Sequence, residues 1–204
     1  MAGTDRGKAT RARLIEATVT VVREVGYAHA STRSIAQAAG VAEGTIYRHF
    51  PDKATLFFAA VLESNAAVVD WVTTLPARAG EGTVEGNLTD AMVRLASLRA
   101  QLVPLELAIA VDPELAAQRR RTIAAAAGSL PPGPPEAIAA YLAEEQRLGR
   151  VDSTVDPRVA AVLILAALFG LAATMSIEDA DLDDGQVASA VRLLVRGIRP
   201  PAER

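Results

Sequence analysis

The chain has 204 residues and a formal net charge of −3. Half of its residues are apolar, which is ample for a continuous core in one or two domains. It contains no cysteine and only two histidines. This excludes disulfide scaffolds, thiolate nucleophiles and cysteine-based zinc sites, and it disfavours most histidine-built metal sites. No apolar leader core follows the basic first residues, so we expect a soluble cytoplasmic protein.

Apolar residues recur at steps of three and four along almost the whole chain, which is the spacing of amphipathic α-helices. The predicted helices span 10–25, 32–39, 43–50, 53–75, 88–102, 105–111, 113–127, 136–148, 157–177 and 186–197. Gly26 is the expected C-cap of the first helix, and Thr32 and Asp52 are the expected N-caps of the second and fourth. Segments 76–87 and 128–135 are rich in proline and glycine and are predicted loops. No run of period-two alternation is convincing, so we predict an all-α fold.

Residues 32–50, TRSIAQAAGVAEGTIYRHF, fit a helix-turn-helix unit. Ala36 is the small residue that the close approach of two helices requires, and Gly40 can take the left-handed conformation of the turn. Four apolar residues are expected to face the core between the helices: Ile35, Ala39, Val41 and Ile46. Two short helices around a glycine are common in helical proteins, so a purely structural role stays open.

The polar residues left outside this core have the chemistry of DNA contacts. They are hydroxyls, a phenol, an imidazole and cations at or near helix N-termini, and such groups contact phosphates and base edges. Charge points the same way, because residues 1–58 carry a net charge of +3 and the remaining 146 residues carry −6. A basic head on an acidic body is typical of a chain whose one end meets a polyanion.

Residues 9–58 resemble the DNA-binding domain of the TetR (tetracycline-repressor) family of bacterial transcription regulators. The segment ATRARLIEATVTVVREVGY resembles the first helix of that family, and STRSIAQAAGVAEGTIYRHFPDKATLF resembles its helix-turn-helix and the start of its fourth helix. The resemblance implies a three-helix DNA-binding domain over residues 1–52. A long helix would join it to residues 53–204, a helical bundle with an effector cavity and a dimer interface.

The resemblance also implies roles for individual residues. Thr32 and Arg33 would hold phosphates at the start of the second helix, and Arg48 is the best candidate to read guanine O6 and N7. Tyr47 would donate its hydroxyl to a phosphate, and Lys53 would place a cation at the N-terminus of the fourth helix. The full set of expected DNA contacts is Thr32, Arg33, Glu43, Gly44, Thr45, Tyr47, Arg48, His49 and Lys53.

Two residues of the recognition helix depart from expectation. Ala42 stands where the family often has a capping side chain, so we expect the helix cap to be weaker by ~1 kcal/mol. Glu43 is an acid beside phosphates. It is either a helix-start carboxylate, which we favour, or a contact to cytosine N4.

For the second domain, the resemblance implies a cavity for a small, mostly apolar effector. Binding of the effector would move the fourth helix and spread the two DNA-binding domains of a dimer. The size of this shift depends on how strongly the effector prefers that state over the DNA-binding one. Polar residues that could face such a cavity, and that could equally be surface or core, are Trp71, Arg94, Gln101, Glu106 and Tyr141.

The last two predicted helices carry an apolar stripe suited to a four-helix dimer interface. It consists of Val159, Leu163, Ala166, Ala167, Gly170, Val187, Val191 and Leu194. A two-fold dimer predicts a palindromic operator. The uncharged run 159–175 is at the short end for a membrane span, and we expect a doubly buried helix at a subunit interface.

Other signals are weaker. Asp179, Asp181 and Asp183 do not fit a calcium loop, and we expect a solvated acidic loop. The arginines at 119–121 are expected at the surface. No nucleophile with a base and no metal cluster is visible, so we expect neither an enzyme nor a cofactor. Besides a homodimeric repressor, an all-helical ligand-sequestering or interaction protein with a structural helix-turn-helix remains open.

Overall fold

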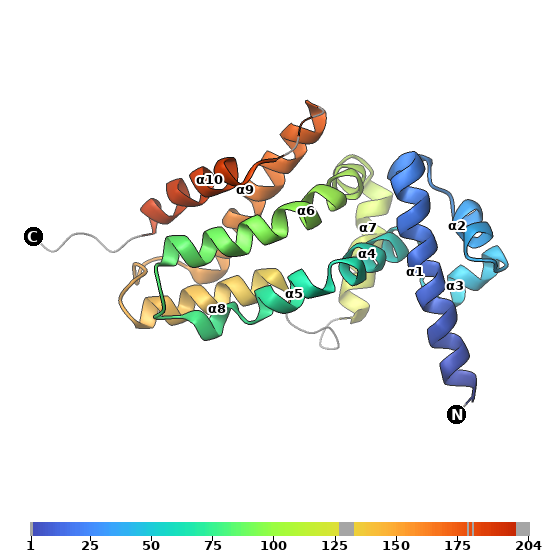
Figure 1. The fold of residues 1–204 in the computed structure, drawn as a ribbon, viewed down its shortest axis with the longest axis horizontal. Helices are drawn as coiled ribbons and strands as arrows, with labels where there is room; N and C mark the ends of the chain where they lie inside the picture. Colours follow the sequence, from blue (N-terminus) through green and yellow to red (C-terminus); the bar gives the residue numbers. More distant parts are fainter. Residues whose placement is uncertain (1, 127–132, 179, 181, 199–204) are drawn as a thin grey trace, which may run out of the picture. The chain divides into compact units, whose positions relative to one another are not determined.

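The computed structural model describes residues 2–126, 133–178, 180 and 182–198, and every regular element in them is a helix (Figure 1). The predicted all-α fold is therefore confirmed. The chain divides into two compact units, residues 1–65 with 104–129 and residues 66–103 with 130–204. These units do not divide at residue 52, because α4 and the segment from Pro104 onward group with the N-terminal helices. The functional division into 1–52 and 53–204 stays a prediction.

The N-terminal unit is built around the helix α1. Its elements are α1 (Ala2–His29), α2 (Thr32–Ala38), the 3₁₀ turn η1 (Glu43–Thr45), α3 (Ile46–His49), α4 (Lys53–Ser64), the end of α6 (Val84–Val111) and α7 (Pro113–Ala126). α1 packs against both α2 and α4. One core joins these helices, and its members include Leu14, Ile35, Ile46 and Leu56.

α1 consists of two helical segments that meet at a kink. Gly26 adopts φ 76° and ψ 159°, which are not helical values, so the long first segment ends there as predicted. A second, short segment follows and runs to His29, and the Ala30 N–H donates to the Gly26 carbonyl at 3.0 Å. The N-cap of α2 differs from the prediction. Ser31 is extended and accepts from the Ser34 N–H, so Thr32 is the first helical residue instead of the cap.

The predicted fourth helix is broken at Asn65. Asp52 caps α4 as expected, but α4 stops at Ser64, and α5 (Ala66–Thr73) and the 3₁₀ turn η2 (Leu75–Arg78) follow. The Asn65 side chain donates to the Val61 carbonyl at 2.8 Å, so a side-chain amide takes the place of a helical bond.

The helices predicted over 88–102 and 105–111 are one helix, α6, with Pro104 inside it. Proline leaves the carbonyl four residues earlier without its helical donor. Because Pro104 and Ala100 are both exposed, water can hydrate that carbonyl.

The C-terminal unit contains α5, η2, the first part of α6, α8 (Pro134–Arg147), α9 (Pro157–Ile177) and α10 (Asp184–Gly197). α8 packs against α5, η2 and α9, and α9 packs against α10. Asp156 caps α9 by accepting from the Arg158 and Val159 N–H groups, at 2.8 and 3.2 Å. Asp183 caps α10 together with Gln186. Asp179 and Asp181 lie outside the described residues.

A buried polar cluster fixes one end of this unit. Glu145 is fully buried and pairs with Arg150, whose Nε lies 3.2 Å from Oε2. The Gly80 N–H donates to Glu145 Oε1 at 3.3 Å, and Asn87 Nδ2 donates to the Tyr141 hydroxyl oxygen at 3.0 Å. Burial, with Glu145 beside the phenol, raises the pKa of Tyr141. The cluster thus connects α8 to the loop before α6.

α9 is the one described helix that is long and apolar enough by itself to cross a bilayer, with a mean hydropathy of 2.3 over 18 residues. Taken together across their break, α4 and α5 pass the same test. Core helices of soluble proteins share this length and composition. α9 buries Ala161, Ile164 and Leu168 within the chain.

Candidate nucleic-acid interface

The turn between α2 and α3 has the geometry that its sequence requires. Gly40 adopts φ +65°, a conformation that side chains with a Cβ rarely take. The Val41 N–H donates to the Ala36 carbonyl at 3.0 Å and closes the turn. Ala36 is 2% exposed and Ile46 is fully buried, so the helices meet over a small residue. The predicted helix-turn-helix core is observed.

The recognition segment is short and weakly capped. Ala42 stands at the N-cap and makes no side-chain hydrogen bond, as predicted. The first turn is a 3₁₀ turn, η1, closed by the Thr45 N–H donating to the Ala42 carbonyl at 2.8 Å. One α-helical turn, α3, follows and ends at Phe50, which is extended before Pro51.

The polar residues predicted to meet DNA lie outside this core. Arg33 and Arg48 are exposed, His49 is half-buried, and Tyr47 is 55% exposed. Gly44 is also exposed, and Thr45 is half-buried. These residues come from the first turn of α2 and from the short η1–α3 segment, so the unit presents donors and cations from two neighbouring elements. Such an array can bind phosphates and reach base edges in a groove.

Glu43 makes a contact that the sequence did not suggest. The Thr32 hydroxyl donates to Glu43 Oε1 at 2.5 Å, across eleven residues. The bond joins the first residue of α2 to the first residue of η1. Glu43 therefore does more than stand at a helix start, and it holds one of the predicted phosphate-binding hydroxyls.

Lys53 points back into its own unit. Its Nζ donates to the Tyr27 carbonyl at 2.7 Å and lies 4.3 Å from the centre of the Tyr27 ring. Burial lowers the pKa of Lys53, and burial also raises the pKa of Tyr27, with a contribution from the charge of Asp52. In this structure Lys53 fastens α4 to the end of α1, and its role as a phosphate contact stays a prediction.

The five effector candidates do not converge on one hollow. Arg94 stacks on the Trp71 ring at 4.3 Å, near the surface of the C-terminal unit. Tyr141 is fully buried in the polar cluster of Glu145, and Gln101 is exposed. Glu106 belongs to the N-terminal unit. Their assignment to an effector stays a prediction.

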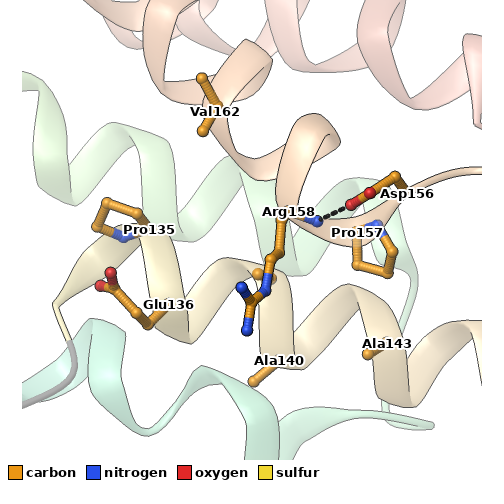
Figure 2. Close-up of a pocket in the computed structure, with 9 residues that line it drawn as sticks. Pro135, Glu136, Ala140, Ala143, Asp156, Pro157, Arg158 and Val162 are labelled. Atoms are coloured by element: carbon orange, nitrogen blue, oxygen red, sulfur yellow. Dashed lines mark hydrogen bonds between the residues drawn. The ribbon is translucent and has the colours of Figure 1, made fainter.

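A hollow that the sequence did not indicate lies between α8 and the start of α9. It has a volume of about 890 Å³. Small and apolar residues line it together with three charged ones, Glu136, Asp156 and Arg158. Figure 2 shows the Arg158 side chain reaching from α9 toward Ala140 of α8, while the Asp156 carboxylate accepts from the Arg158 backbone N–H. The missed signal is the run of alanines on α8, which leaves room for a groove.

The apolar stripe predicted for a dimer is divided between exposed and buried residues. On α9, Val159 and Leu163 are more than half exposed, as is Val162 beside them. On α10, Val187 and Val191 are buried within the chain, so placing them at a dimer interface is wrong. Val187 and Val191 lie around the same small hollow as Ile164, Leu168 and other residues of α6 and α9. Leu193, which the sequence did not single out, is exposed instead.

The other surface predictions are partly confirmed. Arg120 and Arg121 are exposed on α7 as expected. Arg119 is half-buried, because its guanidinium lies 4.0 Å from the centre of the Phe58 ring and attaches α7 to α4.

Known proteins resemble the chain most clearly over the helix-turn-helix. Residues 14–60 match the sequence model described as "Bacterial regulatory proteins, tetR family". The transcriptional repressor KstR of Mycolicibacterium smegmatis is 36% identical over 59 residues, 29% of each chain. The regulator BetI of Stenotrophomonas maltophilia is 31% identical over 117 residues, 54% of this chain and 59% of BetI. The matched segments thus span less than two thirds of these curated relatives.

Solved structures resemble the chain over nearly its whole length. The fatty acid degradation regulator FadR from Bacillus halodurans is 25% identical with a TM-score of 0.66, and the alignment covers 94% of this chain and 97% of FadR. FadR from Bacillus subtilis in complex with stearoyl-CoA is 23% identical with a TM-score of 0.66, covering 92% and 98%. The second likeness concerns the fold alone.

Proposed function

Since residues 14–60 make the chain a member of the TetR family of bacterial regulatory proteins, we propose that it is a DNA-binding transcriptional repressor. It would act as a cytoplasmic homodimer that a small apolar effector releases from a palindromic operator. One observation carries the proposal: Arg33, Tyr47 and Arg48 are exposed around a closed helix-turn-helix core. These exposed donors and cations are the groups that contact phosphates and base edges.

The test is binding of duplex fragments of the source genome, followed by fluorescence anisotropy at about 50 and 200 mM salt. A dimer that neutralises six to ten phosphates should lose roughly 10³–10⁵-fold in affinity over that range, because bound counterions are released. Arg48→Ala combined with Tyr47→Phe should abolish selective binding, and Arg120→Ala on α7 is the matched control. No binding by the wild type at low salt would leave the ligand-sequestering alternative.

The exposed stripe of α9 supports the homodimer. Val159, Val162 and Leu163 form an unpaired apolar face along one helix, and a second copy related by a two-fold axis would cover it. The groove between α8 and α9 includes Val162, so the dimer contact is expected to cover part of the groove.

Light scattering tests the homodimer directly. Leu163→Glu should yield a monomer, and Val111→Glu, at an exposed apolar residue of the other unit, should not. A wild type that is monomeric at micromolar concentration, or a Leu163→Glu variant that still dimerises, would remove this part of the proposal.

An apolar effector is supported by one structural neighbour. FadR from Bacillus subtilis was solved with stearoyl-CoA, which carries a long apolar chain. We place the effector in the C-terminal unit and keep Trp71 and Arg94 as its first candidate contacts, because they stack on each other near the surface. Trp71 is the chain's one tryptophan, so quenching of its fluorescence by acyl-CoAs and free fatty acids measures binding. Arg94→Ala should weaken binding if the stacked pair contacts the effector.

A further inference from the structure

The first turns of α1 extend beyond the core of the N-terminal unit. α1 begins at Ala2, and among its residues from Arg6 onward the first buried one is Leu14. Arg6 and Lys8 are exposed on these turns. A Cβ built on Gly7, between them, would meet nothing within 4 Å. This part of the helix is therefore surrounded by open space on the side of Gly7 as well.

Arg11 fixes the direction of these turns relative to the recognition segment. Its guanidinium pairs with Glu63 of α4 and lies 5.2 Å from the centre of the Phe50 ring. Phe50 is the residue at which α3 ends. Because helical residues rise 1.5 Å each, the Cα atoms of Lys8 and Arg6 lie about 4.5 and 7.5 Å beyond that of Arg11 along the helix. Arg6 and Lys8 thus lie along α1 on the N-terminal side of the level at which Arg11 meets Phe50.

The charge of this segment is uncompensated within the described part of the unit. Residues 6–15, RGKATRARLI, contain four cations and no acid. Arg11 is occupied by Glu63, whereas Arg6 and Lys8 form no ion pair with any described carboxylate. The N-terminus of a helix adds a positive field in the same region. Arg6 and Lys8 lie two residues apart and therefore project from different sides of the helix, so each would meet a separate phosphate. A polyanion with regularly spaced charges can supply both.

We propose that residues 6–11 of α1 form an arm in which Arg6 and Lys8 bind phosphates of duplex DNA beside the groove that α3 enters. The arm is defined as residues 6–11, with Arg11 as its anchor. This inference rests on the proposed DNA binding, and it adds a contact from an element outside the helix-turn-helix. Because phosphate contacts carry no base information, the arm strengthens binding to all sequences and leaves the choice of operator to η1 and α3.

The test is the salt dependence of DNA affinity for the full chain. Each phosphate contact contributes about 0.9 to the slope of log K against log salt. Removing two cations from each of two protomers in Arg6→Ala/Lys8→Ala should therefore reduce the magnitude of the slope by about 3.6. The preference for an operator fragment over a random duplex should stay the same. Arg120→Ala/Arg121→Ala removes the same charge from exposed residues of α7 and should leave the slope unchanged.

A second variant tests the helical order of the arm separately from its charge. Gly7→Ala raises helix propensity by up to ~1 kcal/mol without changing charge, so it should tighten binding up to about fivefold per protomer and keep the wild-type slope. If the arm variant and the α7 variant reduce the slope equally, or if neither reduces it, the arm is refuted. Failure of the wild type to bind any duplex refutes the proposed function instead.

Discussion

Gly40 is the residue at which the helix-turn-helix depends most directly on backbone conformation. Its φ is +65°, and a Cβ added there would meet no atom within 4 Å. The cost of Gly40→Ala is therefore a backbone cost alone, about 1–2 kcal/mol for an L-residue in the left-handed region. Asparagine visits this region more readily, so Gly40→Asn should cost less than Gly40→Ala.

Gly44, four residues further on, provides the matched control. A Cβ there also meets nothing within 4 Å, and its φ is not positive. Gly44→Ala should stabilise the unit by about 0.4–1 kcal/mol, because it reduces the freedom of the unfolded chain. The same chemical change is thus expected to have opposite signs at two neighbouring glycines.

Amide hydrogen exchange over residues 31–50 measures both effects in the full chain. A loss of 1–2 kcal/mol accelerates exchange by about 5- to 30-fold, because 1.4 kcal/mol corresponds to a factor of ten. Gly40→Ala should show this acceleration, Gly40→Asn a smaller one, and Gly44→Ala a slower exchange than the wild type. Equal exchange in the two alanine variants would refute the argument that φ at residue 40 controls the turn.

Three further outcomes are expected. Glu43→Gln keeps an acceptor for the Thr32 hydroxyl but removes a charge beside phosphates, so its affinity for random duplex DNA should rise about two- to fivefold per protomer; unchanged affinity would contradict this. Arg150→Met leaves the buried Glu145 carboxylate without its cation and should cost about 3 kcal/mol in urea unfolding. Adding Glu145→Gln should restore part of that loss, and a further loss would contradict the pairing. Burial raises the pKa of Tyr27 above 10.0, so the folded chain keeps a proton that the unfolded chain loses, and stability falls as the pH rises above about 10. In Tyr27→Phe that fall should be smaller, and an identical urea-midpoint profile would exclude the effect.

The helix-turn-helix was predictable because its requirements are local. A small residue at 36, a glycine at 40 and an apolar residue at 46 each meet a need set by a few neighbouring residues. The missing cap at Ala42 was visible for the same reason, since capping is decided by one side chain and the next backbone N–H groups. The predicted break between 102 and 105 is wrong, because α6 continues through Pro104, and the freed Ala100 carbonyl lies at an exposed position where water can hydrate it.

Periodicity alone determined which faces of the chain are apolar, such as the stripes of the last two helices. Only the tertiary structure decided what covers each face: Val187 is buried inside the chain, whereas Leu163 is exposed. It likewise decided that Lys53 turns to the Tyr27 carbonyl and that Thr32 binds Glu43. The physical reason is the distance along the chain over which each feature is decided. Caps, turns and helix periods depend on residues a few positions apart, whereas the partner of an apolar stripe or a long polar side chain lies on another element, and its distance is set by how the helices pack.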